Sequence, residues 1–173
     1  MVAEEAHKSS SSYLLGIRRF CFRSVMKPEG RIWLLLGASV SFFVAILHVI
    51  SVIIGPAAYS FFGGERLARL AAGGFAAPAV MTLLLAAVHA LFGTYALSGA
   101  GVIRRLPLLV AALLAIGGIY GFRGLSAIEQ AIQILQDPQS LPFRILFYSL
   151  VSLVTGCAYI VGAVKRLQGE GEI

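Results

Sequence analysis

Long apolar runs separated by short polar segments dominate the pattern of this chain. The clearest run covers residues 78–101, PAVMTLLLAAVHALFGTYALSGAG, and carries no charged side chain. A run of this length is long enough to cross a ~30 Å hydrocarbon core as a helix. Similar runs bring the predicted spans to four, at residues 32–54, 76–97, 106–122 and 142–164. The sequence therefore predicts an all-α, polytopic integral membrane protein whose four-helix transmembrane bundle covers residues 32–166.

Small side chains recur at helical spacing inside these runs and predict close helix packing. In the third run, Gly117 and Gly121 form a Gly-x-x-x-Gly pattern, which lets two helix backbones approach each other. The first run has a face of small or weakly polar residues at steps of three and four: Gly37, Ser41, Ala45, His48, Ser51 and Gly55.

The segments between the runs predict short interfacial helices. ERLARLAA, at residues 65–72, lies between glycine pairs and predicts one or two helical turns. Residues 123–141 form the second external loop, and Asp137-Pro138 ends the helix inside it. Its apolar positions form one helical stripe, made of Leu125, Ile128, Ile132 and Leu135. This stripe predicts an amphipathic helix that lies on the membrane surface or caps the bundle.

Polar tails flank the bundle, at residues 1–31 and 167–173. The N-terminal tail is basic, and its second half has an apolar stripe beside Arg18, Arg19 and Arg23. This pattern is typical of a short amphipathic helix on an anionic leaflet, and a disordered leader fits it equally well. Met26, just ahead of the first run, is a second candidate start of the protein.

Composition supports a membrane protein and changes how the net charge is interpreted. The chain has 173 residues, of which 58% are hydrophobic and 13% charged, whereas soluble domains carry about 25% charged residues. Four spans leave no room for a soluble module, so we expect the net charge of +6 to set topology and not to bind nucleic acid. The expected partners are the lipid bilayer and either other membrane proteins or further copies of this chain.

The distribution of Lys and Arg predicts the topology. Ten of the 14 lie in the N-terminal tail, in the turn between the second and third spans, and just after the fourth span at Lys165 and Arg166, and four lie on the opposite side. Because cytoplasmic segments carry the excess of positive charge, we expect both termini in the cytoplasm of a bacterial cell, with the protein in its inner membrane.

Chemical motifs are scarce. The two cysteines, Cys21 and Cys157, form no Cys-x-x-Cys pair, which argues against a thiol oxidoreductase and a structural zinc site. Asp and Glu are missing from the predicted spans, although proton-coupled transporters usually need an intramembrane carboxylate. We therefore expect no cofactor, no bound metal and, on balance, no enzymatic activity.

Two histidines lie inside the predicted spans and are candidate polar residues of the bundle interior. Counting 1.5 Å per residue places His48 about 9 Å and His89 about 20 Å from the outer boundary. Since axial ligands of one iron must share a depth, we expect no haem. Small neighbours of His89 indicate that it faces the interior, with Ser152 and Thr155 within reach as partners. The full set of candidate interior polar residues is His48, His89, Thr82 and Cys157.

Three further residues are candidates for a pocket on the outer side, together with His48. Tyr120 lies one helical turn before Arg123, and Glu129 follows in the second external loop. The alternative is that Arg123 snorkels to the interface and Glu129 is solvated.

The layout of four spans in about 140 residues resembles small bacterial membrane proteins of unknown role, including DoxX-like ones. The resemblance covers residues 26–166 and includes the turn GTYALSGAGVIRRLPLL. It implies a four-helix membrane architecture and carries no functional residue. We expect an accessory or assembly protein. A small-molecule carrier or channel acting as an oligomer is one alternative, and a membrane oxidoreductase subunit is another.

The predicted topology is open to a direct test. Reporter fusions after Glu172 and within residues 98–105 should report the cytoplasm, because these segments carry the excess positive charge. Fusions near Gly64 or Gln133 should report the outside. A periplasmic C-terminus would contradict the predicted number of spans.

Overall fold

The computed structural model describes residues 28–171, which form four long helices, two short helices and the turns between them. All four long helices are apolar and long enough to cross a membrane. The predicted all-α, four-helix membrane bundle is therefore confirmed. The N-terminal tail, for which an amphipathic helix or a leader was predicted, lies almost wholly outside the described residues. The helices are α2 (Pro28–Ile54), α3 (Pro56–Phe61), α4 (Glu65–Ala72), α5 (Ala77–Gly99), α6 (Leu109–Gln136) and α7 (Phe143–Gly171).

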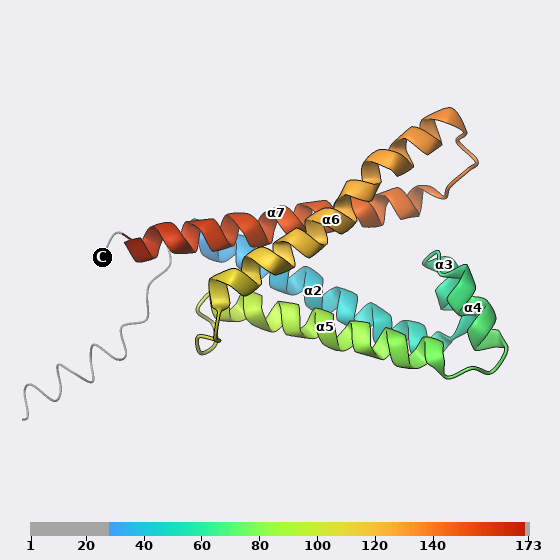
Figure 1. Cartoon of the computed structure of the whole chain (residues 1–173), viewed down its shortest axis with the longest axis horizontal. Helices are drawn as coiled ribbons and strands as arrows, with labels where there is room; N and C mark the ends of the chain where they lie inside the picture. Colours follow the sequence, from blue (N-terminus) through green and yellow to red (C-terminus); the bar gives the residue numbers. More distant parts are fainter. Residues whose placement is uncertain (1–27, 172–173) are drawn as a thin grey trace, which may run out of the picture.

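The long helices form two antiparallel pairs, α2 with α5 and α6 with α7 (Figure 1). The pairs lie together at the end that holds the start of α2, the α5–α6 turn and the end of α7, which we call the terminal end. They diverge toward the end that holds α3, α4 and the α6–α7 turn, which we call the loop end (Figure 1).

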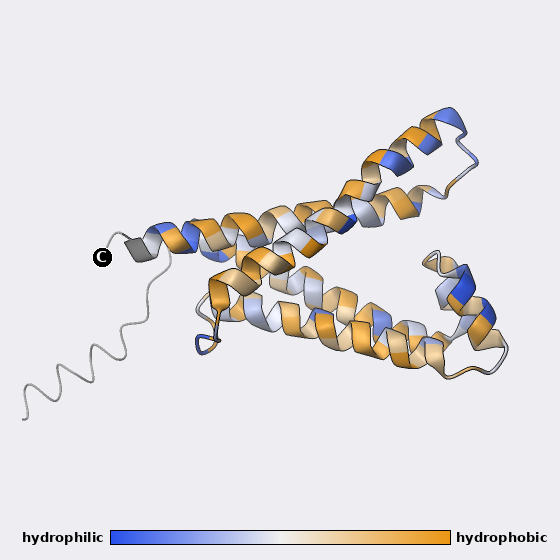
Figure 2. Ribbon diagram, viewed as in Figure 1, coloured by the Kyte–Doolittle hydropathy of each residue, from blue (hydrophilic) through white to orange (hydrophobic). Residues whose placement is uncertain are grey.

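The outer surface of the four long helices is apolar along most of its length (Figure 2). Phe122 is 81% exposed, Ile53 78% and Val154 64%, and each lies on a different long helix. Large apolar side chains exposed on every long helix fit a lipid environment, because they would be costly in water.

Glycines allow α6 and α7 to pack with their backbones nearly in contact. A Cβ atom added to Gly156 would lie 2.7 Å from the backbone nitrogen of Gly121 and 2.8 Å from the carbonyl oxygen of Gly117. One added to Gly124 would lie 2.6 Å from the Cα of Leu153. The predicted Gly-x-x-x-Gly contact thus joins α6 to α7, and Gly124 extends it by one turn.

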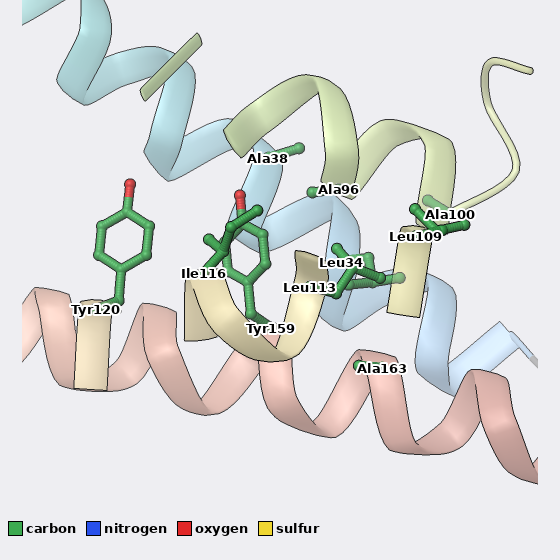
Figure 3. Close-up of a cluster of buried hydrophobic side chains, with 10 residues drawn as sticks. All are labelled: Leu34, Ala38, Ala96, Ala100, Leu109, Leu113, Ile116, Tyr120, Tyr159 and Ala163. Atoms are coloured by element: carbon green, nitrogen blue, oxygen red, sulfur yellow. The ribbon is translucent and has the colours of Figure 1, made fainter. Parts of the chain in front are cut away.

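The hydrophobic core lies toward the terminal end, where side chains from all four long helices meet (Figure 3). Leu34 and Leu113 are fully buried there, and Ala163 of α7 packs beside them. The same end is tied by the ion pair of Lys165 with Glu29 and by Arg166, whose Nη1 donates to the carbonyl oxygen of Gly99. The interior is therefore filled and apolar at this end.

The third span differs from its prediction. It was expected to end at Phe122, but α6 begins at Leu109 and continues without a break to Gln136. Residues 123–136 contain no proline, and the polar side chains among them bond one another and α7, so nothing ends the helix before Asp137-Pro138. The predicted separate amphipathic helix is thus the second half of α6. Glu129 accordingly lies in the same helix as the third span, beyond the apolar residues that end at Phe122.

The loop end is bridged by contacts between α3 and the first turns of α7. Arg144 donates from Nε to the carbonyl oxygen of Phe61 over 2.8 Å, and its guanidinium lies 5.0 Å from the centre of the Phe61 ring. The rings of Phe62 and Tyr148 are 5.8 Å apart. These contacts connect the two helix pairs where their axes have diverged.

Substitution of Gly124 tests the close approach of α6 and α7. Gly124→Ala should lower the melting temperature in detergent, because overpacking costs about 1–3 kcal/mol and exceeds the ~1 kcal/mol gained in helix propensity. Gly118→Ala is the matched control, since a Cβ there would meet nothing within 4 Å, and it should be neutral or stabilising. Equal melting temperatures for the two variants would contradict the packing described.

Candidate functional site

Hydroxyl groups from three helices meet in the middle of the bundle. The Oγ of Ser41 on α2 lies 3.0 Å from the Oη of Tyr120 on α6 and 2.8 Å from the Oη of Tyr159 on α7. All three residues are buried, and the tyrosine rings stack at 5.8 Å (Figure 3). We call Ser41, Tyr120 and Tyr159 the hydroxyl node. Its hydrogen bonds satisfy groups that would otherwise be costly in a nonpolar interior.

Glycine makes room for this node. The ring of Tyr159 lies against Gly37, where an added Cβ would come within 2.8 Å of a ring carbon. Gly37 is one turn before Ser41 on α2, so the stripe of small residues predicted on this helix receives the tyrosine of α7. The Oη of Tyr159 also lies 3.5 Å from the carbonyl oxygen of Gly37.

The two intramembrane histidines lie face to face between α2 and α5. The ring centres of His48 and His89 are 5.1 Å apart and the ring planes are inclined by 23°. The sequence had predicted a stagger of about 11 Å in depth, and the structure contradicts it. The argument against haem that rested on this stagger therefore fails. Stacked rings do not, however, face each other across an iron atom as two axial ligands would.

The error came from the assumption that the first two spans meet the outer boundary at the same level. His89 pairs with His48, so Ile54, six residues after His48, is level with Leu83, six residues before His89. The first turns of α5 therefore extend beyond the end of α2. The connection through α3 and α4 makes this offset possible, and the sequence gives no measure of it.

Tyr120 connects the histidine pair to the hydroxyl node. Its ring lies edge-on to His89, with the ring centres 5.9 Å apart. Phe92 packs against both rings, at 5.8 Å from His89 and 5.9 Å from Tyr120. Polar side chains from all four long helices are thus in continuous contact near the centre of the bundle.

A third polar group lies further toward the loop end, between α6 and α7. Arg123 donates from Nη1 to the hydroxyl oxygens of Ser126, at 2.8 Å, and Ser149, at 2.9 Å. Ser149 is fully buried, and the side-chain amide of Gln130 lies 3.4 Å from the Oγ of Ser126. Arg123 follows Tyr120 by one helical turn, so this group continues the polar series toward the loop end.

The side of α6 that faces α5 changes from apolar to polar along the helix. Near the terminal end, Ala112, Ile116 and Ile119 line an apolar groove shared with α5. The same side continues, at steps of four, three and four, with Arg123, Ser126 and Gln130. The change comes where α6 leaves α5 (Figures 1 and 2). We call the hydroxyl node, the histidine pair and the Arg123 group together the polar tract.

The structure places the other predicted site residues away from this tract or bonded within their own helix. Thr82 is buried and donates to the carbonyl oxygen of Pro78. Cys157 was expected in the interior but is exposed, because its neighbours Gly156 and Ala158 take the buried positions of α7. Glu129 is exposed and accepts from Gln133, apart from Tyr120 and Arg123.

The expected partners of His89 also differ from those observed. Ser152 and Thr155 donate to the carbonyl oxygens four residues before them on α7. The Nδ1 of His89 instead lies 2.8 Å from the carbonyl oxygen of Leu85, on its own helix. His89 does face the interior, but its neighbours come from α2 and α6, because α5 pairs with α2 and has little contact with α7.

Sequence reasoning missed Tyr159, Ser149 and the role of Ser41. Ser41 was noted only as a small packing residue, although its hydroxyl is shared by two tyrosines. A usable signal was present at Tyr159, the one large residue among Gly156, Ala158, Gly162 and Ala163. A phenol on such a face needs a polar partner on the helix against which it packs.

No protein family, curated protein or solved structure was found to match this chain. The resemblance to DoxX-like proteins stays a prediction.

Removal of one hydroxyl group tests the node. Ser41→Ala takes the shared partner from two buried phenols and should lower the free energy of unfolding by about 1–2 kcal/mol. Ser39→Ala is the control, because Ser39 bonds only the carbonyl oxygen of Leu35 on its own helix, and it should change stability by a few tenths at most. Thermal or denaturant unfolding in detergent measures both, and equal losses would contradict the shared role of Ser41.

Proposed function

We propose that this protein is a carrier-type membrane protein that holds a small polar ligand or ion in the polar tract between its two helix pairs. The observation that carries the proposal is the contact of His48, His89, Tyr120, Ser41 and Tyr159, contributed by all four long helices. Ionisable groups are expensive inside a bilayer, and histidines within transmembrane helices are therefore candidates for a ligand or ion site.

The arrangement favours a site that opens at one end of the bundle. Toward the terminal end the tract stops at the fully buried side chains of Leu34 and Leu113. Toward the loop end the polar series continues through Arg123, Ser126 and Gln130, in the part of α6 that diverges from α5 (Figure 1). A tract that is polar at one end and closed by apolar packing at the other suits a carrier, because a channel needs a continuous path.

The other candidate functions draw less support from the geometry. An oxidoreductase subunit with bis-histidine haem would need rings on opposite sides of an iron atom, whereas these rings are stacked. The accessory or assembly role stays a prediction, since the described surface marks no particular site for a partner protein. Oligomerisation remains part of the carrier proposal.

We further propose that the protein lies in a bacterial inner membrane with the loop end outside. The excess of Lys and Arg at the terminal end supports this orientation. The ligand would then reach the tract from the external side.

Cysteine labelling tests the one-ended tract. In a background with Cys21→Ser and Cys157→Ser, single cysteines replace His48, Ser126, Leu113 or Leu125. A membrane-impermeant maleimide is then applied to intact cells and to inverted vesicles. We expect labelling at positions 48 and 126 from the loop-end side only, because water must reach a one-ended site. Position 113, in the apolar core, and position 125, on the lipid-facing surface, are the unlabelled controls.

The outcomes separate the candidate functions. Labelling of the tract from both sides would indicate a channel. If the tract is labelled from neither side, it is a packed interior without access to water. That result would overturn the carrier proposal and leave the accessory role as the better candidate.

A further inference from the structure

The hydrogen bonds of His48 and His89 determine which ring nitrogen of each is available to a ligand. The Nδ1 of His48 lies 2.7 Å from the carbonyl oxygen of Val44, and that of His89 lies 2.8 Å from the carbonyl oxygen of Leu85. A carbonyl oxygen can only accept, so each Nδ1 carries the hydrogen. In a neutral imidazole the lone pair is then on Nε2, at the side of the ring away from the backbone.

This arrangement is the one that metal-binding histidines adopt. A histidine that ligates through one nitrogen almost always donates its other N–H to a carbonyl, a carboxylate or water, which fixes the ring and makes the ligating nitrogen more basic. Both His48 and His89 meet this condition through their own helices. Neither ring depends on a second side chain for its orientation.

The distance between the rings also fits a shared ion. With metal–nitrogen bonds of about 2.0–2.1 Å, the centre of each imidazole lies about 3.2 Å from the metal, and two rings at a tetrahedral angle have centres about 5.2 Å apart. The ring centres of His48 and His89 are 5.1 Å apart. To bind one ion through both Nε2 atoms, the two stacked rings would have to turn until their planes, which are inclined by 23°, meet at the ion.

The surroundings indicate the class of ion and the strength of binding. Imidazole nitrogen suits Zn²⁺, Cu²⁺ and Ni²⁺, whereas Mg²⁺ and Ca²⁺ require oxygen ligands. Within residues 28–171, His, Cys, Asp and Glu do not form any group of three or more that could hold a metal. Two protein ligands therefore leave the other coordination positions of the ion to water or to another small ligand. Such a site exchanges its ion more readily than a closed four-ligand site.

We propose that His48 and His89 together bind one divalent transition-metal ion of the zinc and copper class through their Nε2 atoms, between α2 and α5. The inference rests on the geometry of the histidine pair. It also deepens the proposed function, because it makes such an ion a candidate for the ligand held in the polar tract. Binding to purified protein and labelling of the tract are separate measurements, so either proposal can fail alone.

The test is binding of Zn²⁺ to the full chain, purified in detergent without a histidine tag and in the background that lacks both cysteines. Equilibrium dialysis with metal analysis should give one Zn²⁺ per chain. Binding should also raise the melting temperature, because an ion that binds only the folded state stabilises it by mass action. His48→Gln and His89→Gln should each weaken binding at least tenfold and abolish the thermal shift at the same Zn²⁺ concentration.

His7→Gln is the matched control, since it removes the third histidine of the chain and lies far from the pair in sequence. It should leave the stoichiometry and the thermal shift unchanged. Loss of folding in a His→Gln variant would show in its melting curve without metal, and His48→Asn and His89→Asn then serve as smaller replacements. Absence of binding up to millimolar Zn²⁺, or binding that survives both substitutions at the pair, would overturn the proposal.

Discussion

The packing of Tyr159 against Gly37, together with its hydrogen bond to Ser41, is the contact on which the rest of the bundle depends. The residue is fully buried, and its ring and hydroxyl join α7 to α2 in the middle of the apolar interior. A phenol placed there needs both space and a hydrogen-bond partner, and one turn of α2 supplies them as Gly37 and Ser41. This contact joins the α6–α7 pair to the α2–α5 pair in the middle of the bundle, and the core around Leu34 and Leu113 joins them at the terminal end.

The interior has a different character on the two sides of this contact. On one side Leu34 and Leu113 fill the space between the helices with side chains that need no partner. On the other side stand the histidine pair and then Arg123 with Ser126 and Ser149. The bundle thus combines a tightly packed end, which supplies stability, with an end where polar groups are available for chemistry. Such a division places polar groups inside the bundle without weakening its apolar core.

The fold followed largely from the sequence, whereas the site did not. Uncharged runs of span length leave few alternatives to membrane helices, so the existence and order of the four spans were predictable. Gly117 and Gly121 marked a helix contact, and the structure adds which helix they meet. The axial offset between two neighbouring helices depends on how their side chains pack and on the segments that connect their ends. The depths of His48 and His89 therefore could not be derived by counting residues, and their contact was missed. The continuous α6 was missed because the polar residues after Phe122 were assigned to an external loop with its own helix, although they bond one another within α6 and bond Ser149 of α7.

The hydroxyl node has a consequence for how the chain enters a bilayer during synthesis. Ser41 precedes its partner Tyr159 by 118 residues, so α2 is made long before α7. Until α7 arrives, the hydroxyl of Ser41 is free to donate to the carbonyl oxygen of Gly37 on its own helix, as Ser39 and Ser51 donate to the carbonyl oxygens four residues before them. The first hairpin is therefore self-sufficient in the membrane, and its serine exchanges a local bond for a shared one only when the second hairpin docks. Assembly of the two hairpins can thus wait for the end of synthesis without exposing an unbonded hydroxyl group to lipid.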